Sequence, residues 1–341
     1  MLSFLSDYTE GAHPRVLEHL MARNLVTLPG YGLDSDTASA KAKICAACGR
    51  DDLQIQFLTG GTQTNRIAVS SMLRSYEGVV CADTGHVAVH ESGAIEHSGH
   101  KVIALPQTDG KLAAQTLADC MDAYLADETC EHMVRPGMVY ISHPTELGTL
   151  YTKAELTALS ETCHRYGLPL YLDGARLGYG LVSPASDMTL ADIAALTDLF
   201  YIGGTKVGAL CGEALVYTRR NMPPHFLAVV KQQGALLAKT RVVSQQFEAL
   251  FTDGLYWEIS RHAVDCALRL KEMFVRKGYP LFIDSPTNQQ FFLLDAVQLA
   301  RLQSRVAFSV WQPLSDGRTA VRFVTSWATT DEQLEELEKL L

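Results

Sequence analysis

The chain has 341 residues, 47% hydrophobic and 20% charged, which are ordinary proportions for a globular protein of one or two domains. Its formal net charge of −9 argues against an extended nucleic-acid interface, which needs clustered lysine and arginine. No apolar run reaches the ~20 residues that cross a bilayer. Residues 1–15 also lack the layout of a signal peptide, so a cytoplasmic protein is expected, without nucleic-acid or membrane partners.

In the first two thirds of the chain, short apolar runs alternate with longer amphipathic stretches. The runs predict buried strands at 79–81, 101–104, 138–141, 168–172 and 199–202. Between them, apolar positions at helical spacing predict helices over 113–126 and 153–166. This alternation indicates βαβ units and an α/β fold, with a largely parallel sheet covered by helices on both faces.

The pattern changes after Arg219. Met222-Pro223-Pro224 opens a mostly helical stretch towards His262, and apolar runs follow at 291–294 and 321–324, before an acidic helix from Asp331. We predict a large α/β domain of residues 16–245 and a small α+β domain of residues 246–341. The segment 1–15 is expected to pack near the small domain.

One predicted strand ends on an acid. Asp173 follows the apolar Leu170-Tyr171-Leu172, and ligands of open α/β sheets bind at the carboxyl ends of the strands. A helix N-cap is the simpler interpretation of an aspartate that stands alone at such a place. Arg176, three residues further on, is placed to project into the same crevice.

The next strand ends in Gly203-Gly204-Thr205-Lys206. A single lysine is usually a solvated surface charge. Lys206, however, stands among small and apolar residues, with no further charge until Glu213. A desolvated lysine binds its proton less tightly and becomes a nucleophile towards an aldehyde.

A third element is the small-residue turn Thr59-Gly60-Gly61-Thr62, between a strand from Gln56 and a helix predicted over 65–73. Exposed N–H groups and the helix dipole make such a start an anion site. A phosphate site, an aspartate and a lysine are together what pyridoxal 5′-phosphate (PLP) requires. They would anchor its phosphate, keep its pyridine nitrogen protonated and form a Schiff base with its aldehyde.

The order and spacing of these elements resemble the aspartate-aminotransferase-like (fold type I) PLP enzymes. Within that group the chain is similar to the threonine aldolase and β-eliminating lyase family. The resemblance implies a mostly parallel sheet with helices on both faces and a smaller α+β domain. It also implies that His86 stacks on the pyridine ring. The implied cofactor-binding residues are Gly61, Thr62, His86, Asp173, Arg176, Thr205 and Lys206.

The resemblance also implies substrate contacts. Ser6 belongs to the opening Ser-Asp pair that approaches the substrate, and Tyr31 falls where the family has an active-site tyrosine. Arg322 lies in the C-terminal motif whose arginine grips the substrate carboxylate, assisted here by Arg176. The expected reaction is retro-aldol cleavage of β-hydroxy-α-amino acids of the L-threonine or L-allo-threonine type, which yields glycine and an aldehyde.

The chain departs from the family pattern after the strand at 138–141. Many members carry Asn-Thr-His-Asn there, whereas this chain reads Ser142-His143-Pro144-Thr145-Glu146, which puts Glu146 in the place of the histidine. The base that takes the β-hydroxyl proton is therefore open among His86, His143 and Glu146. The catalytic residues expected are these three with Lys206 and Asp173.

Other functions are also considered. β-Elimination and racemisation would use the same cofactor, and the sequence does not decide which bond to Cα breaks. A metal-dependent hydrolase would use the His86–His100 segment, but a glutamate follows His90 rather than the first histidine, unlike the zinc-protease pattern. Cys45 and Cys48 lack the second pair that a zinc site needs, so no metal is expected. A non-catalytic binding module gives no reason for Lys206.

The expected partner is a small amino-acid substrate. By resemblance, fold type I active sites are completed by a second chain, so a homodimer or homotetramer is expected. The segment Gly234–Arg241 is the candidate to supply residues to the neighbouring site.

Overall fold

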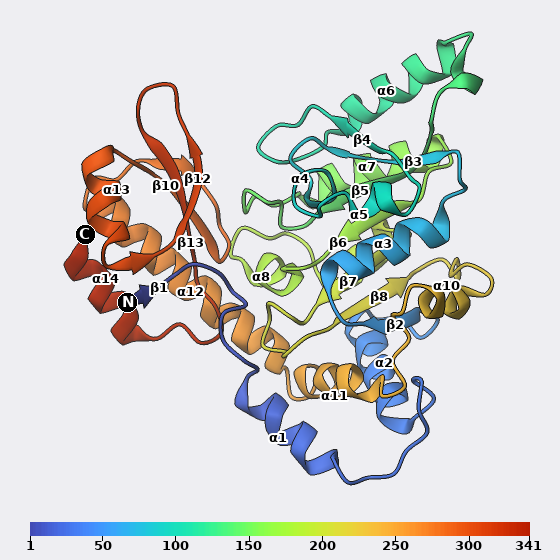
Figure 1. The fold of residues 1–341 in the computed structure, drawn as a ribbon, viewed down its shortest axis with the longest axis horizontal. Coiled ribbons are helices and arrows are strands. Elements are labelled where there is room, and N and C mark those ends of the chain that lie inside the picture. The colour runs from blue at the N-terminus through green and yellow to red at the C-terminus, as the bar shows by residue number, and fades with distance from the viewer.

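The computed structural model describes all 341 residues, and its largest element is a seven-stranded sheet (Figure 1). In the order β2-β8-β7-β6-β5-β3-β4, the strands β3 to β7 pair in parallel. Strand β8 runs antiparallel to both of its neighbours. The strands are β2 (Gln54–Leu58), β3 (Glu77–Ala82), β4 (Val102–Leu105), β5 (Arg135–Ser142), β6 (Leu170–Asp173), β7 (Leu199–Gly203) and β8 (Glu213–Tyr217).

Helices cover both faces of this sheet, because successive strand residues point to opposite sides. Val79 and Tyr171 pack on one face with α3, α4, α5 and α10, whereas Val80 and Leu172 pack on the other with α2, α6, α7, α9 and α11. The bounds are α2 (Ser35–Ala47), α3 (Gly61–Met72), α4 (His86–Val89), α5 (Ala94–His97), α6 (Ala114–Ala126), α7 (Lys153–Arg165), α8 (Leu177–Val182), α9 (Leu190–Leu196), α10 (Phe226–Gln232) and α11 (Arg241–Leu250). A short 3-10 helix spans Cys130–His132.

Two predicted helical segments can be compared with those observed. The helix expected over 65–73 already begins at Gly61, because the Gly60 carbonyl accepts both the N–H and the hydroxyl of Thr64. The mostly helical stretch expected from 222 towards 262 consists of the helices α10 and α11 and the first part of a third helix that begins at Leu255. Gly234, with a φ of 70°, follows the end of α10, and Gly254, with a φ of 71°, directly precedes Leu255.

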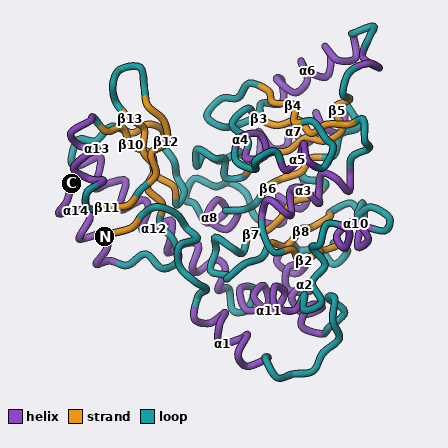
Figure 2. The backbone as a smooth tube through the Cα atoms, viewed as in Figure 1, coloured by secondary structure: helices purple, strands orange, loops and turns teal.

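A second, antiparallel sheet has four strands in the order β12-β13-β10-β9. Its core includes the stacked rings of Phe274 and Phe292, 3.9 Å apart, and it takes in Leu2 and Phe4 of the N-terminal segment. The remaining elements of the chain are β1 (Leu2–Ser3), α1 (Pro14–Arg23), α12 (Leu255–Arg276), β9 (Leu281–Ile283), β10 (Gln289–Leu294), α13 (Ala296–Gln303), β11 (Val306–Ala307), β12 (Ser309–Pro313), β13 (Thr319–Val324) and α14 (Asp331–Leu340), of which α1 packs into the core of the large sheet through Val16. Figure 2 shows the two sheets as separate groups of strands.

The boundary predicted between residues 245 and 246 falls inside α11. Phe247 and Leu250 of that helix pack into the core of the large sheet, as do Leu255 and Val264 of α12. The later part of α12, represented by Phe274, belongs to the core of the small sheet. We therefore propose that the domains divide within α12, which runs between the two sheets in Figure 1. No helix combines the length and the apolar character needed to span a membrane.

Candidate active site

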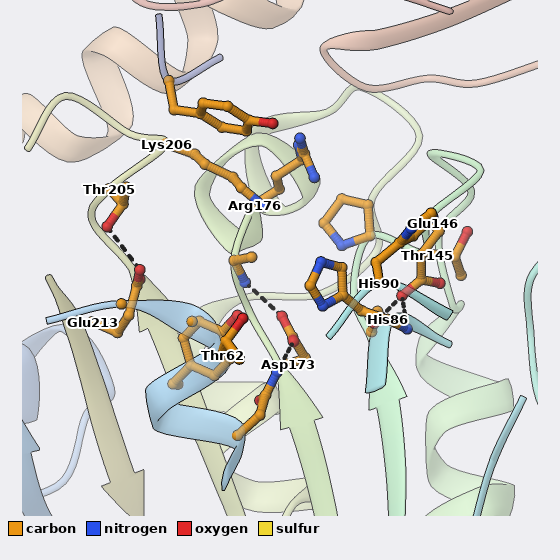
Figure 3. Close-up of a pocket in the computed structure, with 18 of the residues that line it drawn as sticks. Thr62, His86, His90, Thr145, Glu146, Asp173, Arg176, Thr205, Lys206 and Glu213 are labelled. Atoms are coloured by element: carbon orange, nitrogen blue, oxygen red, sulfur yellow. Dashed lines mark hydrogen bonds between the residues drawn. The ribbon is translucent and has the colours of Figure 1, made fainter. Parts of the chain in front are cut away.

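A cavity of about 330 Å³ opens where several strands of the large sheet end. Ser142 ends β5, Asp173 ends β6, and Lys206 follows β7, so the carboxyl ends of three neighbouring parallel strands contribute to one wall. Figure 3 shows Lys206, Asp173 and His86 directed into the same space. A second hollow of about 470 Å³ continues towards the small sheet, where it reaches Arg322 and Trp311.

The carboxylate of Asp173 is buried and held by several donors. Its Oδ2 accepts hydrogen bonds from the Tyr140 hydroxyl at 2.6 Å and from Asn65 Nδ2 at 3.0 Å, and its Oδ1 accepts the Ala175 N–H. Burial alone raises the pKa of a carboxyl group, but the nearby His86 and these hydrogen bonds hold the pKa of Asp173 below its ordinary value. Asp173 is therefore ionised in spite of its burial, and it is more than a helix cap.

His86 is fixed by a polar chain that leads back to Asp173. Its Nδ1 lies 2.9 Å from Oε1 of the buried Glu91. Asn65 donates to that same oxygen at 2.7 Å and to Asp173, while its own oxygen accepts the Tyr171 hydroxyl. The hydrogen bond to Glu91, which Asn65 holds in turn, fixes the orientation of the His86 ring.

Lys206 is partly buried in the turn that follows β7. Burial, together with the positive charge of Arg176, lowers the pKa of Lys206 to about 8. Its Nζ lies 6.0 Å from the centre of the Tyr8 ring. The hydroxyl of Thr205 donates to Glu213 at 2.8 Å instead of facing the solvent. The predicted Lys206 thus lies in the cavity, with a lowered affinity for its proton.

The start of α3 borders the same cavity. Gly60, Gly61 and Thr62 line it, and no side chain caps the first turn of the helix. The N–H groups of a first turn have no partner within the helix and favour an anion. A side chain at Gly61 would lie 3.2 Å from the Tyr201 hydroxyl, so only a small residue leaves the space open.

The two predicted substrate arginines differ in their partners. Arg176 is partly buried, and two hydrogen bonds of 2.7 and 2.9 Å join it to the carboxylate of Asp7. Arg322, on β13, contacts only neutral groups, Gln289 Oε1 at 3.0 Å and Ser309 Oγ at 3.3 Å. Burial and the charge of Arg176 lower the pKa of Arg322 to about 10, so it remains a cation at neutral pH.

Of the three candidate bases, Glu146 and His86 line the cavity and His143 does not. Glu146 is half-buried, and its Oε1 accepts the Ser142 hydroxyl at 2.5 Å and the His86 N–H at 2.8 Å. Burial raises the pKa of Glu146. His143 is fully buried, and burial lowers its pKa to about 4. Its Nδ1 accepts the Tyr151 N–H at 3.4 Å, and its Nε2 has no partner.

Two further predicted residues also lie away from the cavity. The side chain of Ser6 is buried without a hydrogen-bond partner, and its neighbour Asp7 takes the polar contact with Arg176. Tyr31 is about half exposed, and the Nζ of Lys231 lies 5.2 Å from its ring centre.

The histidines of the His86–His100 segment do not form one cluster. The rings of His86 and His90 are 5.8 Å apart, but His97 is exposed and His100 donates from Nδ1 to the Glu77 carbonyl. No group of three or more His, Cys, Asp or Glu side chains has the arrangement of a metal site.

Several cavity residues were not predicted from the sequence. Tyr8, Asn65, Tyr201 and Glu213 all line the cavity, and Glu91 orients His86. Of these residues, only Glu213 could be suspected from the sequence, because it is a charged residue at the start of an apolar strand. The others lie in segments that were assigned to helix, strand or loop for local reasons, and only long-range contacts bring them to the site.

The residues fit PLP. An ionised carboxylate, an amine of lowered proton affinity and an uncapped helix start border one cavity, and these groups match a protonated pyridine, an aldehyde and a phosphate. The cavity volume lies within the range of small-molecule sites.

Residues 3–306 match the beta-eliminating lyase family. The chain belongs to this family. A low specificity L-threonine aldolase of Pseudomonas sp. (strain NCIMB 10558) is 31% identical, over 98% of this chain and 95% of the relative. A threonine aldolase of Leishmania major superposes with a TM-score of 0.95 at 42% identity, and the match covers 100% of this chain and 98% of that one.

Solved structures of lower sequence identity share the fold alone. A double mutant of the aspartate aminotransferase of Thermus thermophilus superposes with a TM-score of 0.68 at 15% identity, and the match covers 100% of this chain and 92% of the aminotransferase chain. The predicted family, the fold type I architecture and the assignment to the lyases are confirmed.

Proposed function

We propose that this protein is a PLP-dependent aldolase that cleaves the Cα–Cβ bond of β-hydroxy-α-amino acids of the L-threonine or L-allo-threonine type. The products are glycine and an aldehyde. The observation that carries the proposal is that an ionised Asp173 and a poorly solvated Lys206 line one cavity, and that Lys206 also lines the adjoining hollow together with Arg322. The likeness to proteins named threonine aldolases supports the choice of substrate.

The chain offers a group for each part of PLP. Gly61 and Thr62 at the start of α3 would hold the phosphate, Asp173 the pyridine nitrogen and Lys206 the aldehyde carbon. His86 would lie against the ring, with Thr205 and Arg176 nearby. When bound, PLP supplies a carbonyl that condenses with amines and a ring that accepts the electron pair left on Cα by bond cleavage.

Substrate recognition falls to the arginines. Arg322 can exchange its neutral partners Gln289 and Ser309 for a carboxylate, which is a charge-assisted and stronger acceptor. Arg176 already forms an ion pair with Asp7. Its part is to hold the Asp7 carboxylate in place and to lower the pKa of Lys206 through its positive charge. Ser6 and Tyr31 would reach the substrate only after a rearrangement or from a second chain.

The base for the β-hydroxyl proton is Glu146 in this proposal, with His86 as the alternative. Both lie on the cavity wall, and Glu146 has two donors at Oε1 that hold its carboxylate in one orientation. Burial raises its pKa, which makes it a stronger base than an ordinary glutamate. The buried His143 is the least suited of the three.

We also propose a cytoplasmic homodimer or homotetramer. The loop that carries Tyr31 meets the segment 234–241, where the Tyr31 N–H donates to the Ala238 carbonyl. Leu25 and Leu33 of that loop are strongly exposed, at 93% and 78%, as expected for a surface that packs against another copy. Sedimentation of the purified chain tests the assembly, and a fully active monomer contradicts it.

The activity is tested by incubating the PLP-loaded protein with L-threonine, L-allo-threonine, phenylserine and serine. Release of glycine with an equal amount of aldehyde is expected from the first three. Pyruvate and ammonia would instead assign β-elimination, and a change of substrate chirality alone would assign racemisation. Lys206→Ala is the control, since it removes the amine on which the reaction depends.

A further inference from the structure

The hollow that adjoins the cavity has a volume of about 470 Å³. It shares Lys206, His86 and His90 with the cavity, and it is also bordered by Trp311 and Arg322 of the small sheet. Because Lys206 and Arg322 border the same space, a substrate held near both lies in this hollow. The methyl group that threonine carries on Cβ is small beside it. The hollow therefore has room for a larger β-substituent.

An irregularity in β12 brings Trp311 to this hollow. Val310 pairs with Val321, and Gln312 pairs with the next residue of β13, Ala320, so Trp311 is the extra residue of a β-bulge. Successive side chains of a regular strand point to opposite faces of the sheet. Here Trp311 and its two predecessors all line the hollow. A bulge redirects a side chain in this way, and bulges recur next to active sites.

The indole ring of Trp311 contacts three neighbours. Its centre lies 5.2 Å from the ring of Phe291 and 6.4 Å from that of His90, and both pairs are edge-on. The guanidinium of Arg322 lies 5.3 Å from the same centre. Edge-on aromatic pairs and a cation near an aromatic ring are both favourable arrangements. The half-buried Trp311 is therefore a fixed apolar surface at the edge of the hollow.

His90 extends this surface towards the cavity. Its ring lies 5.8 Å from that of His86, and Figure 3 shows the two rings side by side. Burial, with the charges of His86 and Arg322, lowers the pKa of His90, so its ring is neutral at neutral pH. We call Trp311 and His90 the aromatic wall. Most of the other residues that line the hollow are polar or charged, so the wall is the part that suits an apolar group.

We propose that Trp311 is a specificity-determining residue, which favours substrates with an aromatic β-substituent over those with a methyl group. The proposal rests on the proposed function, since it concerns the β-substituent of that substrate. A substrate whose carboxylate is bound by Arg322 places its β-substituent in the hollow that the aromatic wall borders. An aromatic ring there reaches the indole at the separations that aromatic pairs prefer, whereas a methyl group offers little surface to it.

The kinetic test compares L-threo-phenylserine with L-threonine. The two substrates share the amine, the carboxylate and the β-hydroxyl, and they differ only in a phenyl or a methyl group on Cβ. The measured quantity is the ratio of their kcat/KM values. In Trp311→Leu the ratio of phenylserine to threonine should fall by about two- to tenfold, which corresponds to the loss of one aromatic pair. Trp311→Phe keeps a ring and should retain most of the ratio.

The ratio separates specificity from a purely structural role. Trp311 also contacts Arg322, and loss of that support would weaken both substrates by the same factor, because both carry the same carboxylate. Gln312→Leu is the matched control. Gln312 is the next residue of β12, is exposed and does not line the hollow, so this variant should keep the parental ratio. Circular dichroism confirms that each variant is folded.

Binding is measured separately, by calorimetric titration of the PLP-loaded protein with L-phenylalanine and L-alanine. Neither amino acid has a β-hydroxyl, so neither undergoes retro-aldol cleavage, and the two differ by one phenyl group. The parent should bind phenylalanine more tightly than alanine, and Trp311→Leu should lose most of this preference. The parental preference is measured without any variant, so it remains a test if Trp311→Leu does not fold.

The proposal is overturned if the parent binds phenylalanine and alanine equally, or if Trp311→Leu changes kcat/KM for both substrates by the same factor. Failure to release glycine from any substrate would instead contradict the proposed function. The titration would still decide whether Trp311 recognises an aromatic side chain.

Discussion

The guanidinium of Arg176 is bound to the carboxylate of Asp7 through two hydrogen bonds, although 169 positions separate the residues in the chain. This pairing occupies Nε and one terminal nitrogen of Arg176, the edge of the guanidinium that would otherwise form a bidentate contact with a substrate carboxylate. Arg322 has no such anion, since its partners are the amide of Gln289 and the hydroxyl of Ser309. We therefore propose different tasks for the two arginines, with substrate binding depending chiefly on Arg322.

The first prediction concerns Arg322→Leu. The variant should keep its PLP absorbance but bind substrate more weakly, because loss of one partner of a charge-assisted contact in a closed site costs about 2–5 kcal/mol. Steady-state kinetics with L-threonine measure the effect, as a large rise in KM. Arg318→Leu on the same hairpin is a matched control, since Arg318 pairs only with the exposed Asp316. Unchanged saturation kinetics in Arg322→Leu would exclude this role.

The second prediction concerns Asp173→Asn. An amide does not offset the charge of a pyridinium, so turnover should fall sharply although the side chain still fills its place between Tyr140 and Asn65. PLP content and glycine release are measured on the same preparation. Near-parental turnover would show that Asp173 acts only as a structural acceptor.

The third prediction concerns Glu146→Gln. Burial raises the pKa of Glu146, and only its ionised form takes a proton, so the parental rate should fall as the pH drops through that pKa. The glutamine keeps an oxygen for Ser142 and His86 but is no base. The rate of cleavage should drop by about 10²-fold and lose this acid limb.

The pH profile of kcat measures both effects, and Glu161→Gln on the exposed face of α7 is the control. If Glu146→Gln cleaves threonine at the parental rate with the same profile, the base is elsewhere. His86 is then the next residue to test.

The fourth prediction concerns stability. Burial lowers the pKa of His143 to about 4 from an ordinary 6.5. His143 therefore takes up a proton at higher pH in the unfolded chain than in the folded one. The contribution of the neutral ring to the free energy of unfolding is complete above pH 6.5 and is lost as the pH falls towards 4. That difference corresponds to roughly 3 kcal/mol.

Urea unfolding across this pH window measures the loss. His143→Gln cannot titrate, so its stability should decline less steeply than that of the parent. The exposed His132→Gln should behave like the parent. If the free energy of unfolding declined equally with falling pH in the parent and in His143→Gln, the His143 ring would have to be protonated in the folded state as well.

Much of the architecture follows from local sequence. Apolar runs broken by helical periodicity predicted β3 to β7 and the helices α6 and α7, because burial on both faces of a parallel sheet demands continuous apolar strands. Asp173 and Lys206 were found by the same logic, since each follows directly from the strand that carries it. The antiparallel direction of β8 was not predicted, because a short apolar strand has the same pattern in either direction.

What the sequence by itself determined is therefore the family, the order of strands and helices, and the residues at the strand ends. The tertiary structure alone decided which of those residues share the cavity. It paired Asp7 with Arg176, brought Glu146 to the backbone of His86, buried His143 away from the site and set Glu213 against the turn of Lys206. The physical reason is range: periodicity and turn chemistry act over a few residues, whereas burial, charge pairing and pKa depend on groups that only the folded chain brings together.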